Sequence, residues 1–217
     1  MRLASALVGF AIATSPALAH ADGVYFTESF GPGAVRGPLS SRLDGDTFRI
    51  KVSAGYRFGD WAIEPWLGAD ITNIDHPSYD DPDLGSYGID LKRIMPVSEH
   101  VSVYIRGSMS HIAFPDQAPC CDLYDPGFAP YAYDLYGYGG RGLGVGVGAQ
   151  LSGKGSVWGL LAWPLFFLVK DGPQMNAGIF VEDSYDYYRF QPPSSYSSSI
   201  DASITRLTFG FAVGSDF

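Results

Sequence analysis

The sequence predicts an all-β protein, an antiparallel transmembrane β-barrel of eight strands. Three observations predict it: apolar and polar residues alternate with period two, five cations and five carboxylates in the alternating segments share the polar face, and the chain is rich in glycine and aromatic residues. The chain has 27 Gly, 14 Tyr and 14 Phe but only 4 Met. This composition favours strands with aromatic girdles over helices.

The start of the chain predicts export. Arg2 is followed by an apolar run and then by small residues, the arrangement of a secretory signal peptide. Alanines allow cleavage after Ala19 or Ala21, so residues 1–21 are the expected signal peptide and 22–217 the barrel domain. A membrane-anchoring helix would need roughly 20 apolar residues, and this run is shorter.

The charge excludes nucleic acid as an expected partner. The chain has 14 Lys plus Arg against 23 Asp plus Glu, a net charge of -9, whereas phosphate binding needs basic clusters. Acidic residues gather in two proposed loops, but no regular calcium-loop spacing appears, so we expect solvated carboxylates and neither a metal nor a cofactor. The first loop holds Asp75, Asp80, Asp81 and Asp83, and the second holds Asp116, Asp122, Asp125 and Asp134.

The only cysteines, Cys120 and Cys121, are neighbours in the second of these loops. Adjacent Cα atoms lie about 3.8 Å apart, below the usual disulfide range of about 4.4 Å or more, so a bond between them would be strained. A redox role would need a spaced partner or a nearby histidine. We therefore expect a fold that does not depend on a disulfide.

The segment from Thr47 to Phe58 shows the alternation most clearly. Its apolar face is Phe48, Ile50, Val52, Ala54, Tyr56 and Phe58, and the opposite face is Thr47, Arg49, Lys51, Ser53, Gly55 and Arg57. The turn Gly59-Asp60 follows, and the pattern resumes from Trp61 to Thr72. These two segments predict a β-hairpin with a very short turn.

Six further segments alternate in the same way. They run from Val24 to Phe30, Tyr87 to Met95, Val101 to Met109, Leu143 to Leu151, Ala177 to Tyr187 and Leu207 to Val213. In the segment from Leu143 to Leu151 one face consists of glycines except for Gln150, which leaves space for bulky interior neighbours. Eight is the smallest even number typical of bacterial outer-membrane barrels.

The charges distinguish a barrel from a soluble β-sandwich, which also alternates. Five cations and five carboxylates share the polar faces of the strands: Arg49, Lys51, Lys92, Arg106 and Arg206, and Glu64, Asp70, Asp90, Glu182 and Asp186. A dry sandwich core would bury this set at high cost, whereas a polar barrel interior can pair and hydrate it. The apolar face then meets lipid.

One segment does not alternate. From Ser156 to Val169 apolar residues occupy both strand faces, and Pro164 lies inside the run. It is too short for a spanning helix, so we expect a short apolar helix or irregular element at the periplasmic rim. The alternative is a pair of extra strands, which would make the barrel ten-stranded.

The end of the chain resembles a known family. Counting back by twos from Phe217 gives Ser215, Val213, Phe211, Phe209 and Leu207, which resembles the C-terminal assembly signature of outer-membrane barrels, although Ser215 departs from it. With short turns on one side and long loops on the other, the mature chain is similar to the small OmpA/OmpX-like barrels. The resemblance implies location in the outer membrane, contact with its lipid, and recognition of Phe217 by the barrel assembly machinery.

An eight-stranded barrel is filled by side chains, which argues against a general diffusion porin. We therefore expect a structural or surface-interaction role through extracellular loops. The loop from Phe114 to Gly139 is the candidate for binding an extracellular partner, although its aromatic residues could instead pack on the loop itself or at the membrane interface. Those residues are Tyr124, Phe128, Tyr131, Tyr133, Tyr136 and Tyr138.

Two other functions stay open. A lipid-modifying hydrolase needs a paired nucleophile and base, and the sequence offers His100 with Ser102, near Glu99, and His111 with Ser110. Neither pair has a convincing orienting group, so no catalytic residue is assigned. A carrier of small hydrophobic solutes would need a lateral opening, for which Pro65 and the glycine-rich sixth strand could loosen strand pairing.

Overall fold

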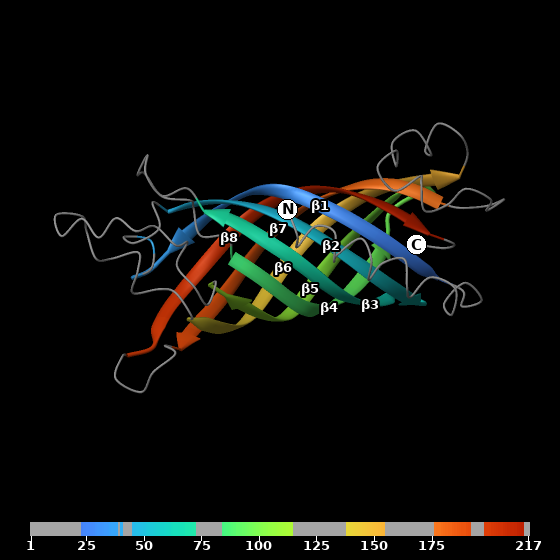
Figure 1. The fold of residues 1–217 in the computed structure, drawn as a ribbon. Coiled ribbons are helices and arrows are strands. Elements are labelled where there is room, and N and C mark those ends of the chain that lie inside the picture. The colour runs from blue at the N-terminus through green and yellow to red at the C-terminus, as the bar shows by residue number, and fades with distance from the viewer. Residues whose placement is uncertain are drawn as a thin grey trace, which may run out of the picture.

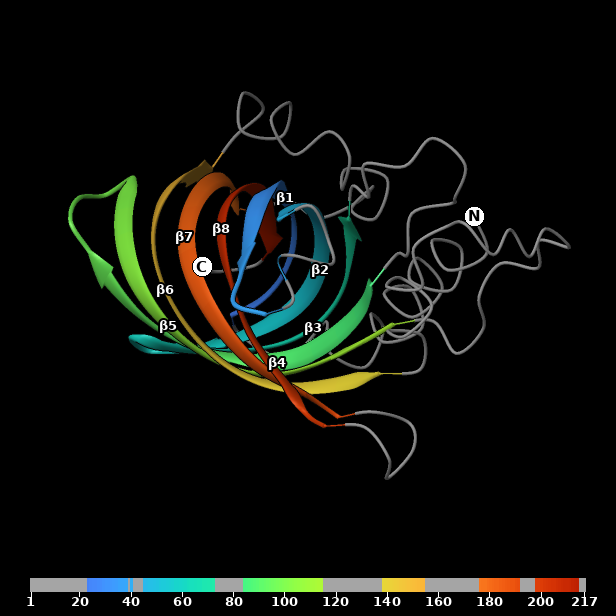
Figure 2. The same cartoon turned by 90° about the vertical axis from the view of Figure 1, so that its left-hand side faces the viewer.

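Eight antiparallel strands close into one barrel in the computed structural model, which describes residues 23–38, 40, 45–72, 84–114, 138–154, 176–191 and 198–214. The strands are β1 (Val24–Arg36), β2 (Asp46–Phe58), β3 (Trp61–Thr72), β4 (Leu84–Pro96), β5 (Val101–Ala113), β6 (Gly139–Lys154), β7 (Asn176–Gln191) and β8 (Ile200–Gly214). Each strand pairs with the next, and β8 pairs with β1 (Figures 1 and 2). Among these residues no helix is long and apolar enough to span a membrane.

The strand number decides between the two barrels that the sequence allowed. β6 pairs directly with β7 from Gly139↔Gln191 to Lys154↔Asn176, so no strand stands between them. The ten-stranded alternative is therefore wrong, and the eight-stranded prediction is confirmed. The segment from Ser156 to Val169 lies outside the described residues, as do the expected signal peptide and Phe217.

Both ends of the barrel domain lie at one rim, since Tyr25 pairs with Gly214. The predicted hairpin turn at Gly59 and Asp60 lies at this rim, and Gly59 has φ 61°, a left-handed conformation that glycine adopts readily. The turn between β4 and β5 lies there too. The β1–β2, β3–β4, β5–β6 and β7–β8 connections leave from the opposite rim.

The two faces of the wall differ as the alternation predicts. Met109 on the outer face of β5 is 70% exposed, whereas Asp90 on the inner face of β4 is fully buried. Exposed apolar side chains cover the outside of every strand, with Trp61, Tyr56 and Phe58 near one rim and Tyr87 and Tyr187 toward the other. A closed barrel with an apolar exterior and a charged interior is a transmembrane barrel of the outer-membrane type. The predicted fold and location are thus confirmed.

Prolines interrupt the pairing at two places. Between β2 and β3 the register runs to Ser53↔Trp66 and resumes at Tyr56↔Ile63, so the gap falls beside Pro65, which has no N–H to donate. The β1–β8 pairing has a similar gap at Pro32. β6, in contrast, is paired continuously on both sides, so its glycines do not loosen the wall as the carrier hypothesis required.

The inward glycines make room for large side chains from neighbouring strands. A Cβ placed on Gly148 would lie 2.2 Å from the Tyr104 ring, and one on Gly142 would lie 2.5 Å from the Tyr188 ring. Both tyrosines are buried. The glycine face predicted for the sixth strand therefore has the expected role, since it accepts the rings of β5 and β7.

This packing predicts different outcomes for two glycines. We expect Gly148→Ala to lower the free energy of unfolding by about 1–3 kcal/mol, because the buried Tyr104 ring cannot move away from the added methyl group. Gly107→Ala is the matched control, because Gly107 faces outward on β5 and nothing lies within 4 Å of its added Cβ. Urea titration of the refolded protein in lipid vesicles measures both, and equal stability of the two variants would contradict the account.

Candidate functional site

The charged residues of the interior form a polar cluster inside the described barrel. All ten predicted lumen charges face inward, and all but Lys51, whose side chain is 12% exposed, are buried at the level of the whole residue. The predicted balance of five cations and five carboxylates therefore holds inside the barrel. Charges buried in this way must be paired, because an unpaired ion in a low dielectric is costly.

Asp90 on β4 is one centre of this cluster. It accepts hydrogen bonds from Lys51 Nζ at 2.5 Å, from Trp66 Nε1 at 2.8 Å and from Arg106 Nη1 at 3.1 Å. Arg106 Nε also lies 3.0 Å from Glu182. Asp90 thus binds side chains of β2, β3 and β5, which joins strands that are not all neighbours.

Asp186 on β7 is the second centre, and three arginines surround it. Arg206 Nη1 donates to it at 2.5 Å, while Arg106 and Arg49 lie 3.8 and 3.9 Å away. Arg206 Nε donates to Asp70 on β3 at 2.9 Å, across the barrel. Arg106 contacts both Asp90 and Asp186, so the two centres form one network.

The individual pairing partners go beyond the balanced charge set that the sequence predicts. Lys51 and Arg106 pair with Asp90, whereas Glu64 pairs with Lys92 at 2.9 Å and accepts a hydrogen bond from the Tyr25 hydroxyl. Arg49 lies near Asp186 and stacks 4.5 Å over the Trp66 ring. These partners come from non-adjacent strands as well as neighbours, and sequence alternation carries no information on such contacts.

Apolar layers close the charged interior at both ends. Toward the rim opposite the termini, where the β1–β2, β3–β4, β5–β6 and β7–β8 connections leave, nine buried apolar residues pack together: Val35, Leu84, Ile112, Phe114, Tyr138, Tyr188, Phe190, Ala202 and Ile204. Toward the opposite rim, Tyr25, Ala62, Ile94 and Tyr104 form a second layer. The lumen between the two layers is therefore a packed core, which agrees with the expectation that it is filled by side chains.

Phe114 and Tyr138 correct the predicted partner-binding loop. Both belong to the first apolar layer, and the Phe114 N–H donates to the Tyr138 carbonyl at 3.0 Å. Tyr138 was expected among the surface aromatics, but it is only 6% exposed. The remaining aromatics of that loop lie outside the described residues, as do both acidic clusters, Cys120 and Cys121.

The two candidate hydrolase pairs differ in what the structure shows of them. Ser110 faces inward and donates to the Tyr188 hydroxyl at 3.3 Å, whereas His111 faces outward with its ring 5.2 Å from that of Tyr87. That pair therefore lies on opposite sides of the wall. His100 is exposed in the turn before β5, and Ser102 is half-buried on the inner side of that strand.

The sequence reasoning missed two carboxylates on the outer face. Asp183 on β7 and Glu28 on β1 both occupy positions in an otherwise apolar outward series. The signal was available, because Asp183 continues the series of Ile179, Val181 and Tyr185 by steps of two. An ionisable group on a lipid-facing wall is expensive and is therefore a candidate for function.

The ion-pair network predicts that replacing Arg206 strongly destabilises the barrel. Arg206→Met leaves Asp70 and Asp186 without their closest cation, so we expect the free energy of unfolding to fall by roughly 3–5 kcal/mol. Arg189→Met is the control, because Arg189 pairs with Asp201 at the rim of the wall, near the end of β7 and the start of β8, where water screens an ion pair and it contributes little. Urea titration in vesicles compares them. Equal losses would show that the interior pairs do not hold the barrel together.

Comparison with known proteins supports the fold. The chain matches no family model and no curated protein sequence. Among solved structures it is similar to Neisserial surface protein A (NspA), with 17% identity and a TM-score of 0.52 over 88% of this chain and 97% of that one. Ail, the attachment invasion locus protein of Yersinia pestis, also matches, with 13% identity and a TM-score of 0.39 over 88% and 99% of the two chains. The chain thus has the fold of small eight-stranded outer-membrane barrels, as the resemblance implied.

Proposed function

We propose that this outer-membrane barrel acts at the cell surface, where its extracellular loops bind a partner and the barrel supports them. The observation that carries the proposal is the closed interior. Charged side chains fill the middle, and apolar layers seal both ends. A solute has no open path through such a lumen, so the surfaces outside the barrel are left for function.

The residues that flank the candidate loop support a role in partner binding. The connection between β5 and β6, residues 115–137, leaves the barrel between Phe114 and Tyr138, which are buried and joined by a backbone hydrogen bond. A loop held at both ends by packed residues binds with less loss of conformational freedom than one on a flexible stem. Its aromatic residues are of the type that anchors protein interfaces.

Assembly belongs to the same proposal. We infer that Phe217 delivers the chain to the barrel assembly machinery, because steps of two in the sequence connect it with Phe209 and Phe211, which lie on the outer face of β8. The apolar exterior would then contact outer-membrane lipid. NspA is named as a surface protein, which agrees with a surface role here.

A diffusion channel is the rival function, and electrical recording separates the two. We expect the refolded protein to give no steady porin-like current in a planar bilayer, because the buried Arg106 and Arg206 pairs and the two apolar layers block the lumen. A general porin refolded in the same lipid is the positive control. Reproducible steady currents at neutral pH would favour transport and overturn the closed-lumen argument.

The loop itself gives the direct test. Replacing residues 115–137 by a Gly/Ser linker of equal length, with Phe114 and Tyr138 kept, should preserve heat-modifiability on gels, because both residues of the apolar layer remain. The same change should abolish binding of intact cells to envelope partners, surfaces or neighbouring cells. A Gly/Ser linker for residues 73–83 is the matched control and should leave that binding intact.

Protease added to intact cells should cut within residues 115–137. Protection there, with cleavage only from the periplasmic side, would mean that the barrel lies in the opposite orientation. Loss of heat-modifiability after the loop exchange would make the loop structural. Unchanged binding after the exchange would remove the loop from the proposed function.

A further inference from the structure

Asp183 is a carboxylate on the apolar outer face of the wall. Its partners across the strands are Val147 on β6 and Leu207 on β8. Along β7 the next outward residues are Val181 and Tyr185. Asp183 therefore has apolar outward neighbours on all four sides, within the belt that faces lipid.

No hydrogen bond or ion pair from the described residues reaches the Asp183 side chain. This is unlike Asp201 on β8, which is also outward but holds Arg189 at 2.9 Å. Lipid chains offer no hydrogen-bond donor, so a donor or a cation for the Asp183 carboxylate must come from another molecule.

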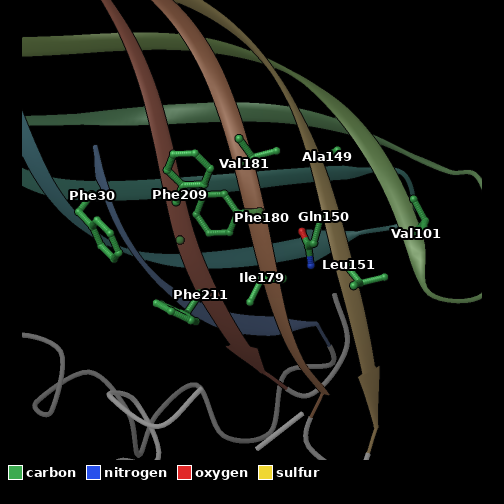
Figure 3. Close-up of a pocket in the computed structure, with 11 residues that line it drawn as sticks. Phe30, Val101, Ala149, Gln150, Leu151, Ile179, Phe180, Val181, Phe209 and Phe211 are labelled. Atoms are coloured by element: carbon green, nitrogen blue, oxygen red, sulfur yellow. The ribbon is translucent and has the colours of Figure 1, made fainter. Parts of the chain in front are cut away.

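The wall around Asp183 is hollowed. Asp183 and Val147 line two adjoining hollows of about 260 and 460 Å³. The larger of these shares Ala149 and Val181 with a third of about 590 Å³, which reaches Leu151 and Ile179 near the rim of the termini. We call this run of hollows the β6–β7 furrow, and its lower part is shown in Figure 3.

Side-chain size explains the furrow. β6 and β7 present small outward groups, among them Val147, Ala149 and Val181, beside the bulkier Phe209 and Phe211 of β8. Figure 3 shows Ala149 and Val181 next to the two phenylalanines. The two larger hollows are lined mainly by apolar side chains, whereas Ser184, Tyr185 and Thr205 also line the smallest one. Asp183 is the only carboxyl group among the residues of the described wall that line the three hollows.

We propose that the β6–β7 furrow binds lipophilic amines that enter from the bilayer, with the ammonium group on Asp183 and the apolar chain along Val147, Ala149 and Val181. An ammonium group donates a charge-assisted hydrogen bond to the carboxylate, and each ion removes the cost of the other in lipid. The larger hollows fall within the usual volume range of small-molecule sites, about 300–1,000 Å³. Because the furrow lies on the outer wall, the ligand reaches it sideways through the lipid and not through the barrel.

The chain provides a matched control for Asp183. Glu28 is also an outward carboxylate with apolar neighbours, Val52 and Phe211 across the strands, but it lines none of the three hollows. If a carboxylate in the lipid-facing wall were enough to bind amines, both Asp183 and Glu28 would bind them. If the furrow is needed as well, only Asp183 will bind them.

Methyl NMR of the protein in nanodiscs of zwitterionic lipid tests the proposal, with dodecylamine as the probe. We expect saturable shifts of the Val147 and Val181 methyl signals and none at Val52. Asp183→Asn should weaken dodecylamine roughly tenfold, the size of a lost charge-assisted hydrogen bond, while Glu28→Gln leaves its affinity unchanged. Dodecanol, which has the same chain without the charge, should bind the wild type no better than dodecylamine binds Asp183→Asn.

Several results would overturn the proposal. Equal affinity of dodecylamine and dodecanol would remove Asp183 from recognition, and equal effects of the two variants would remove the furrow. If the wild type forms a dimer that Asp183→Asn abolishes, the occupant is a second copy of the chain and not an amine. Heat-modifiability of each variant establishes that it is folded, and the loop exchange at residues 115–137 leaves this site untouched, so its outcome is independent of the surface function.

Discussion

The contact of Asp186 with three arginines is the interaction on which the interior depends. Arg49, Arg106 and Arg206 reach it from β2, β5 and β8, so one carboxylate on β7 links strands from all around the barrel. A closed wall of eight strands leaves room only for side chains. Charges confined there must neutralise one another, which explains why five cations and five carboxylates face inward together.

The same lack of room explains the glycines and the apolar layers. Each large inward group needs a small neighbour, and Gly142 and Gly148 supply it beneath Tyr188 and Tyr104. These rings also belong to the two apolar layers at the ends of the lumen. The same inward side chains therefore fill the lumen, pair its charges and close its ends. A change that opened the lumen would also separate charged pairs and expose them.

The sequence predicted what depends on residues near one another along the chain. Period two assigned Arg106 inward and Met109 outward, and the turn at Gly59 located a hairpin, because both features are local. It did not predict that Glu64 would pair with Lys92 or that Arg206 would reach Asp70. Those contacts depend on the register of each strand with its neighbours and on how the strands coil around the barrel.

Reasoning from the sequence failed for two residues: it assigned the buried Tyr138 to the surface, and it overlooked Asp183 on the outer face. Tyr138 looks like part of a surface loop because it follows a tyrosine-rich stretch, yet it lies at the first inward position before β6 and packs with Phe114 and Phe190. Asp183 was overlooked because the residues around it read as an ordinary apolar face. A pattern of alternation averages over a strand and hides a single exception.

An exception to the alternation on the outer wall, such as Asp183, points to a function. A lipid-facing wall has no structural need of a carboxylate, whereas Asp90 and Asp186 inside the barrel each hold several strands together. Asp183 makes no such contact with the described residues, so the stability of the barrel gives no reason for its presence. A molecule dissolved in the bilayer can meet the protein only at this outer wall, where Asp183 stands beside the small side chains Val147 and Val181 of β6 and β7.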